Sequence, residues 1–264
     1  MKAGTERAAR WLVEQHRARV PFSGFPPGVA PRTVDAAYDV QDAFLAHKVR
    51  ACGPLCGWKI ALSNPAMQDM VGLPEPVAGR LCARQVVGAP GRVRASDYGR
   101  LLIEFEIAVE LSEDLADRGT PYTRASVAGA VASVRPAFEL IDDRAADYAT
   151  LKHHALQLVS DNAWNEGVVL GTRRTDWRNL DLAGLRGRTW IDGDLAGEGQ
   201  GSDLMGHPLE ALAWIANHAL RRGTPLRAGE LAILGSLMTS KFPKPGQGLR
   251  FELEGFAPIH LQVD

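Results

Sequence analysis

The sequence predicts a mixed, sheet-rich α/β protein whose β-sheet is rolled or sandwiched, and three observations lead to this class. Two segments near the N-terminus, residues 6–20 and 34–51, carry apolar residues at helical spacing. From about residue 55 the chain changes to short apolar runs separated by glycine and proline, which is typical of strands. These strands do not alternate regularly with helices, which argues against a doubly wound parallel sheet.

The elements divide the chain into an N-terminal helical cap over residues 1–54 and a sheet-rich domain over residues 55–264. In the cap, a link dense in proline and glycine separates the two helices at residues 21–31. Further helices are expected near residues 123–131, 150–158 and 207–222. Strands are expected at residues 57–62, 77–87, 101–111, 134–141, 167–170, 188–191, 231–234 and 249–263.

Composition and charge exclude several classes of protein. A chain of 264 residues with 45% hydrophobic residues can bury a large core, so disorder is not expected. The formal net charge of -1 and the absence of a lysine or arginine cluster argue against a nucleic-acid partner. No apolar run approaches the roughly 20 residues of a membrane-spanning helix, and the N-terminus lacks a signal-peptide core. We therefore expect a cytoplasmic protein with no membrane partner.

The three cysteines, Cys52, Cys56 and Cys82, are odd in number and suit a reducing compartment. Cys52 and Cys56 have no second pair and no histidine at zinc spacing, so they are expected to be packing residues rather than ligands.

Two glutamates inside the apolar segment at residues 101–109 are the most informative feature of the chain. Successive side chains on a strand point to opposite faces, so Glu104 and Glu106 project together while Phe105 lies on the other side. Two like charges in an apolar setting repel each other and pay desolvation, a cost that a bound divalent cation would remove. Alternatively this face is simply solvated, because Glu110 continues the same alternation.

A third carboxylate favours the metal hypothesis over the solvated face. Glu139 is the one acidic residue in the apolar run at residues 134–141, which is expected to form another core strand. Three carboxylates from two strands would suit a hard, oxygen-loving cation such as magnesium or manganese.

Three further polar residues, at positions 59, 161 and 207, lie within or beside apolar segments. Lys59, within the strand at residues 57–62, either extends its ammonium group to the sheet edge or points into a cleft and pairs with a substrate carboxylate. Asp161 lies where a helix meets a strand, and such residues usually satisfy local backbone groups. His207 precedes Pro208 at the start of a predicted helix, so a capping role is expected.

Six short segments follow one another along nearly the whole chain: DAAYDVQ at 35–41, GWKIALS at 57–63, EFEIA at 104–108, PAFE at 136–139, DNA at 161–163 and GHP at 206–208. In this order they resemble the 2-oxopent-4-enoate hydratase family, which belongs with the fumarylacetoacetate hydrolase superfamily. The order and spacing of the motifs are more specific than any single motif. The family also contains 4-oxalocrotonate decarboxylases, which share these motifs.

The resemblance implies a fold of the fumarylacetoacetate hydrolase type, usually assembled into a homo-oligomer. It implies that Glu104, Glu106 and Glu139 bind Mg²⁺ or Mn²⁺. It also implies that Lys59 is a catalytic residue of the active site, where the partner is a small-molecule 2-oxo acid.

At the substrate itself we expect Ser63, Asp161, Trp164 and Val77, and two of these depart from the family pattern. Hydratases of the family tend to carry an aspartate at the position of Val77, where it helps to move protons, whereas the decarboxylases tend to have an apolar residue there. A serine commonly follows the Asp-Asn-Ala motif, and Trp164 in its place should change the shape and polarity of the pocket.

The predicted function is that of a divalent-metal-dependent lyase acting on short 2-oxo or 2-hydroxydienoic acids. Addition of water to a substrate like 2-hydroxypenta-2,4-dienoate, giving a 4-hydroxy-2-oxo acid, is the first expectation. Decarboxylation of a 4-oxalocrotonate-type substrate is the alternative, favoured by Val77. A non-catalytic partner subunit is a third possibility, against which the three glutamates argue. A carbon-carbon bond hydrolase would need a histidine base, and neither His153 nor His154 lies in a motif that predicts one.

Overall fold

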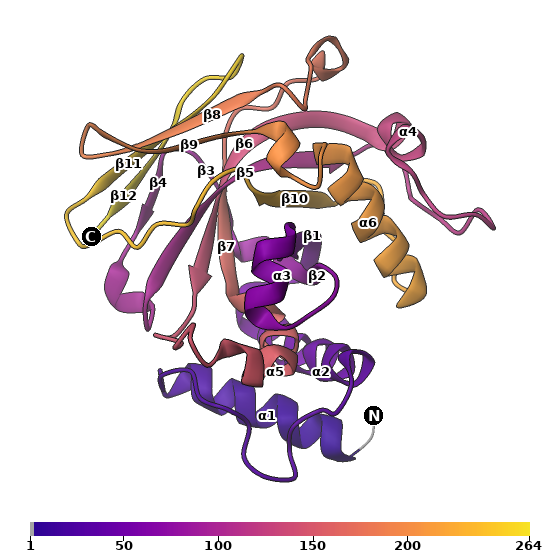
Figure 1. The fold of residues 1–264 in the computed structure, drawn as a ribbon, viewed down its shortest axis with the longest axis vertical. Helices are drawn as coiled ribbons and strands as arrows, with labels where there is room; N and C mark the ends of the chain where they lie inside the picture. Colours follow the sequence, from indigo (N-terminus) through magenta and orange to yellow (C-terminus); the bar gives the residue numbers. More distant parts are fainter. Residues whose placement is uncertain (1–2) are drawn as a thin grey trace.

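The computed structural model describes residues 3–264 and contains two mixed β-sheets that share one core, with three helices gathered at one end (Figure 1). The larger sheet has seven strands in the order β2-β1-β10-β5-β6-β7-β3. Its strands are β1 (Leu55–Ala61), β2 (Val77–Cys82), β3 (Val86–Gly88), β5 (Leu101–Leu111), β6 (Val131–Asp142), β7 (Asn165–Leu170) and β10 (Leu231–Ser236).

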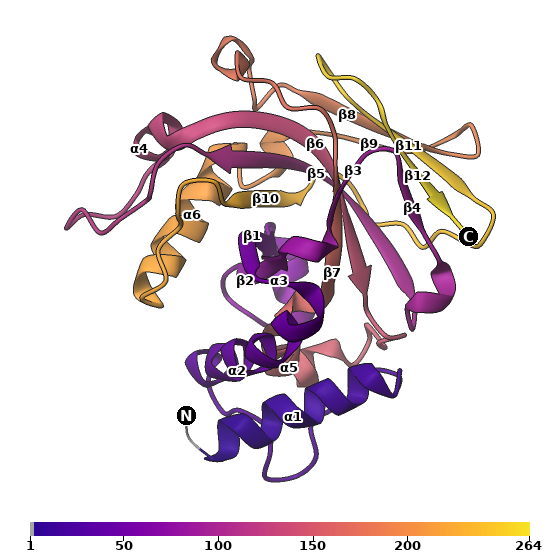
Figure 2. The ribbon, with the colours of Figure 1, turned by 180° about the vertical axis from the view of Figure 1, so that it is seen from behind.

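The smaller sheet has five strands in the order β4-β12-β11-β8-β9 and lies against one end of the larger one (Figure 2). Its strands are β4 (Gly91–Val93), β8 (Arg186–Ile191), β9 (Asp194–Gln200), β11 (Gly248–Leu253) and β12 (Ile259–Val263). Both sheets combine parallel and antiparallel pairs, and neither closes into a barrel. The predicted sheet-rich, mixed α/β class is therefore confirmed.

An aromatic cluster joins the two sheets in the core. Phe105 of β5 lies 5.8 Å from Phe138 of β6 and 5.6 Å from Phe251 of β11, measured between ring centroids. All three side chains are fully buried. The apolar face of β5 thus fills the interior, as alternation in the sequence predicts, and the opposite face carries its glutamates.

Helices cover the concave side and one end of the larger sheet. The helices α1 (Ala3–Arg17), α2 (Val34–Cys52) and α5 (Ala155–Ser160) pack together at the end where the chain begins (Figure 1). The long helix α6 (Pro208–Arg221) packs on β1 and β10. The division into a cap at 1–54 and a domain at 55–264, like the homo-oligomer, stays a prediction.

Helix starts follow local capping chemistry. Asn64 accepts a hydrogen bond from the backbone N–H of Met67 and precedes Pro65, which begins the short helix α3 (Pro65–Val71). His207 caps α6 in the same way, with Nδ1 accepting from the N–H of Leu209 at 3.0 Å. The predicted capping role of His207 is confirmed.

Several boundaries differ from the sequence expectation. The run at 249–263 forms two strands, β11 and β12, because the chain reverses at Gly255, whose φ is 78°. The run at 77–87 is likewise interrupted between β2 and β3. The expected helix at 123–131 is reduced to the single turn α4 (Arg124–Val127) followed by a 3₁₀ turn.

The cysteines also differ from expectation. Cys52, at the end of α2, and Cys82, at the end of β2, form a disulfide, and Cys56 is free. The prediction that Cys52 is only a packing residue is wrong, because pairing depends on how closely α2 approaches β2, which sequence spacing does not reveal. Within residues 3–264, no helix combines the length and the apolar character needed to cross a membrane.

Candidate metal centre and substrate cavity

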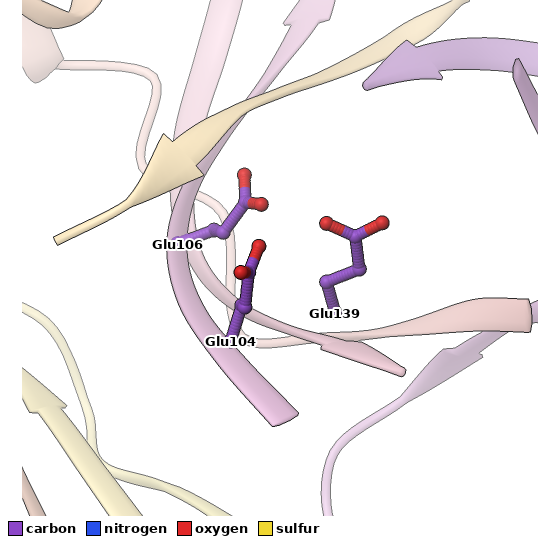
Figure 3. A group of neighbouring side chains, drawn as sticks. All are labelled: Glu104, Glu106 and Glu139. Carbon is purple, nitrogen blue, oxygen red and sulfur yellow. The ribbon is translucent and has the colours of Figure 1, made fainter. Parts of the chain in front are cut away.

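The structure brings Glu104, Glu106 and Glu139 together on one face of the larger sheet. One carboxylate oxygen from each lies within 4.8 Å of the others, and Figure 3 shows the three carboxyl groups pointing toward a common space. The register of β5 and β6 explains this, because Glu104 pairs directly with Glu139 and Glu106 is two residues along the same face.

The three carboxylates are held by few hydrogen bonds. Glu106 accepts from the backbone N–H of Gly235 at 2.8 Å, and Glu104 accepts from the hydroxyl of Ser240 at 2.8 Å. Glu139 accepts from the amide of Asn165 at 2.8 Å. These bonds orient the carboxyl groups but leave Oε1 of Glu106 and Oε2 of Glu139 buried without a hydrogen-bond partner in the described part of the chain, residues 3–264. Buried oxygens of this kind are normally satisfied by a donor or a cation.

One ammonium group faces this acidic cluster. Nζ of Lys59 lies 3.2 Å from Oε1 of Glu139, and both side chains are almost fully buried. Within residues 3–264, no other salt bridge reaches the three glutamates. Three ionised carboxylates and one ammonium leave an excess of two negative charges, which a divalent cation would balance.

The pKa values report the same imbalance. Burial, reinforced by Glu139 and Glu104, raises the pKa of Glu106 well above its usual range. Burial and then Glu139 raise the pKa of Glu104 as well. Burial alone would lower the pKa of Lys59, but the three carboxylates outweigh it and raise that pKa above its usual value, so the ammonium stays protonated.

Glu110 shows what an ordinary acidic residue on the same strand face looks like. It is only partly buried, forms a close ion pair with Arg135 of β6, and lies 3.7 Å from Arg173. The alternative of a solvated, conventionally paired face therefore describes Glu110 but not Glu106, which is fully buried. Among residues 3–264, neither Glu104 nor Glu106 forms a salt bridge.

A cavity of about 490 Å³ opens beside the carboxylates. Of the residues predicted to act at the substrate, Lys59, Ser63 and Trp164 line it, together with Glu104. The sequence did not point to Gly235, Ser236, Ser240 or Asn165, which line the cavity or orient its carboxylates. Small or polar residues at or near strand ends are too common for the sequence to single out these four. In contrast, Asn64-Pro65 is a capping signal that could have identified α3, whose methionines form part of the wall.

Asp161 and Val77, which are also expected at the substrate, do not line this cavity, and their contact with a substrate stays a prediction. Val77 is buried in the hydrophobic core, where β2 pairs with β1. Asp161 lies behind the cavity wall, where its side chain pairs closely with Arg144 and accepts from Nε2 of His16 at 2.5 Å. Its partners are thus side chains from distant segments, not the local backbone.

Asp161 begins the turn that presents Trp164 to the cavity. Asn162, Ala163 and Trp164 all have positive φ angles, of 55°, 45° and 63°. Each such angle costs about 1–2 kcal/mol for a residue other than glycine, so surrounding contacts must hold the turn. Asn162 supplies two of these contacts. Its Oδ1 accepts a hydrogen bond from the backbone N–H of Arg80 at 2.7 Å, and its Nδ2 donates to the carbonyl oxygen of Arg80 at 2.9 Å. A Cβ on Gly79 would lie 2.9 Å from the Asn162 carbonyl, which explains the glycine there.

Replacing Asp161 with alanine is expected to lower the free energy of unfolding by about 3 kcal/mol, because it leaves the Arg144 guanidinium buried without a counter-charge. Burial opposes ionisation of Asp161, but His16 and Arg144 hold its pKa below the usual value. This stabilisation is therefore present above the pKa of an unfolded aspartate and is lost as pH falls through the lower native pKa. Urea unfolding at pH 7 measures it.

The matched control is Asp176→Ala, which removes an exposed ion pair with Arg174 and should cost less than about 1 kcal/mol. Equal losses for the two variants would show that Asp161 does not anchor the turn.

Comparison with known proteins places the fold and the site in context. The model of the fumarylacetoacetate (FAA) hydrolase C-terminal domain matches residues 73–264. A 2-hydroxyhexa-2,4-dienoate hydratase of Comamonas testosteroni is 33% identical over 87% of this chain and 86% of the relative. A 2-keto-4-pentenoate hydratase of Paraburkholderia phymatum is 34% identical over 78% of this chain and 76% of the relative.

Among solved structures, a 4-oxalocrotonate decarboxylase from Pseudomonas putida G7, complexed with magnesium and adipate, superposes with a TM-score of 0.90. That match covers 100% of this chain and 98% of the other at 24% identity, and it shows a shared fold. With relatives named as hydratases over most of its length, the protein is an enzyme. The chain belongs to the fumarylacetoacetate hydrolase family.

Proposed function

We propose that this enzyme is a divalent-metal-dependent lyase that adds water to 2-hydroxy-2,4-dienoates, giving 4-hydroxy-2-oxo acids. The observation that carries the proposal is the group of Glu104, Glu106 and Glu139 beside the cavity, which Glu104 lines, with two buried oxygens that lack a partner among residues 3–264. Relatives at 33% and 34% identity that are named as hydratases support hydration as the reaction.

The donor set fits a hard cation. Three carboxylates would hold Mg²⁺ or Mn²⁺, which prefer oxygen ligands and keep further positions for water or substrate. Such an ion supplies a Lewis acid that polarises the oxygens of a 2-oxo acid.

We assign to Lys59 the role of binding the reacting oxygens of the substrate. Its ammonium group lines the cavity beside Glu104 and stays protonated because of the surrounding carboxylates. A fixed, buried donor at this position would bind the substrate carboxylate or stabilise negative charge that develops on an enolate oxygen. Ser63 and Trp164 shape the cavity around the rest of the substrate.

Decarboxylation of a 4-oxalocrotonate-type acid is the second candidate, and Val77 is the observation that favours it. The resemblance places Val77 where the family's hydratases tend to carry an aspartate, and an aliphatic side chain cannot transfer a proton. Against it, among residues 3–264 Lys59 is the one cationic side chain that lines the cavity, so a second substrate carboxylate would lack a charged partner.

The test is an assay of the purified protein with Mg²⁺ against 2-hydroxypenta-2,4-dienoate and, separately, 2-oxohex-3-enedioate. We expect loss of dienoate absorbance and formation of the 4-hydroxy-2-oxo acid, without release of CO₂ from the second compound. Treatment with a chelator should remove this activity, and Mg²⁺ or Mn²⁺ should restore it. CO₂ release from the dicarboxylate without hydration of the dienoate would establish the decarboxylase instead. Activity that is unchanged by the chelator would contradict the metal centre.

A further inference from the structure

The cavity has both polar and apolar lining residues, and it is larger than a short dienoate requires. Lys59, Glu104 and Ser240 are among its polar residues. Its apolar residues include Met67 and Met70 of α3, Leu151 and Trp164, which together are called the apolar wall.

The volume of the cavity exceeds that of the short substrate. The compound 2-hydroxypenta-2,4-dienoate has eight non-hydrogen atoms, which occupy at most about 240 Å³ even at the ~30 Å³ that each water takes in the liquid. The cavity measures about 490 Å³, so roughly half of it would stay empty behind a substrate anchored at the carboxylates. Apolar space of this size is normally filled by an apolar group.

A second substrate carboxylate would find no free cation among the described residues of the cavity. Apart from Lys59, the charged residues that line the cavity are Glu104 and Asp203, both acidic. Arg100 lies near the mouth, 5.0 Å from the Phe242 ring, but the buried carboxylate of Asp143 accepts its Nε–H at 2.8 Å and neutralises it. A carboxylate at the far end of a substrate would therefore lose hydration and gain no cation.

We infer that the natural substrate is a 2-hydroxy-2,4-dienoate, or the corresponding 2-oxo acid, with an uncharged apolar substituent of several carbons at its distal end. This inference rests on the proposed function and adds the substrate class. The substituent lies between Trp164 and the methionines of α3, and the acid end lies at the carboxylates. The indole Nε1 of Trp164 has no acceptor within residues 3–264, but an indole N–H carries no charge that could balance a carboxylate.

Binding and turnover test the inference separately. With Mg²⁺-loaded protein, calorimetry should show that 2-oxononanoate binds more tightly than 2-oxopentanoate, by about fourfold for each buried methylene. The acid of equal length with a terminal carboxylate, 2-oxononanedioate, should bind at least tenfold more weakly than 2-oxononanoate. In turnover, kcat/KM for a dienoate bearing a butyl group at its distal carbon should exceed that for 2-hydroxypenta-2,4-dienoate.

A charge variant tests the placement of the substituent. Met67 is 36% exposed on α3, so Met67→Lys should fold and should bring a cation to the apolar wall of the cavity. We expect it to shift the affinity ratio of 2-oxononanoate to 2-oxononanedioate by at least tenfold toward the dicarboxylate. The matched variant Met67→Leu should leave this ratio within about twofold.

The outcomes separate the two proposals. Turnover of the short dienoate, with no gain in affinity or kcat/KM for the longer acids, would overturn the apolar substituent and leave the hydratase intact. Preference for 2-oxononanoate in binding, with no turnover of any dienoate, would overturn the hydratase and support the apolar ligand class. If no 2-oxo acid binds to the Mg²⁺-loaded protein, both proposals are wrong.

Discussion

Glu106→Gln is expected to lower metal-dependent turnover by more than about 1,000-fold, because several kcal/mol of transition-state stabilisation would come from the ion. The amide cannot supply the negative charge that the buried, unpartnered Oε1 of Glu106 provides. Turnover of the dienoate at saturating Mg²⁺ and the dissociation constant of Mn²⁺ measure the effect. The control is Glu110→Gln, on the same strand face but paired with Arg135, which should retain activity within a few-fold. Equal activity of Glu106→Gln and Glu110→Gln would contradict the metal centre.

Although Glu106→Gln should lower turnover, it should stabilise the metal-free protein at pH 8. Burial and neighbouring carboxylates raise the pKa of Glu106 above its value in the unfolded chain, so the native state binds the extra proton. Its contribution to stability is therefore greatest at low pH and is lost as pH rises from the usual carboxyl range through the raised native pKa. With a chelator present, Glu106→Gln should unfold at a higher temperature than the parent at pH 8, and the difference should shrink at pH 5. A lower unfolding temperature for the variant at pH 8 would refute this account.

Lys59→Met is expected to lower kcat by about 100- to 1,000-fold, the range found when one charged or dipolar donor to a developing oxyanion is removed. Metal affinity should be kept or slightly increased, because the variant removes a cation that lies 3.2 Å from Glu139 and would repel the ion. Turnover and Mn²⁺ binding, measured on the same sample, separate the two effects.

Lys48 supplies the matched control for Lys59. It is also largely buried and lies 2.6 Å from Glu166, but it does not line the cavity. Lys48→Met should therefore leave kcat within a few-fold. Full activity of Lys59→Met, or a loss no greater than that of Lys48→Met, would show that Lys59 is not a catalytic residue.

The strands and the acidic cluster could be predicted because both follow from alternation along a strand. The run 101–111 is apolar except at one parity, and the structure forms β5 over these residues. The position of Glu139 opposite Glu104 depends on the register of β5 and β6, which the sequence does not specify, but two buried strands with isolated acids favour such a meeting.

The cavity wall could not be predicted in the same detail. Three successive residues with positive φ at 162–164 have no signature in a segment without glycine. Contacts with distant segments hold the turn, among them the hydrogen bonds of Asn162 with the backbone of Arg80 and the side-chain partners of Asp161. The resemblance identifies positions near a site, not the direction of a side chain, and neither Asp161 nor Val77 lines the cavity. The pairing of Cys52 with Cys82 was missed for a similar reason, since it reflects the docking of α2 on β2.

Through the contact between His16 and Asp161, helix α1 affects the wall of the cavity although it does not line the cavity itself. None of residues 3–17 lines the cavity, yet His16 of α1 reaches the carboxylate on which the turn carrying Trp164 depends. Proteolysis or a fused tag that displaces α1 would remove one of the two side chains that bind this carboxylate. The shape of the substrate chamber is thus governed partly by a helix that the ligand never meets.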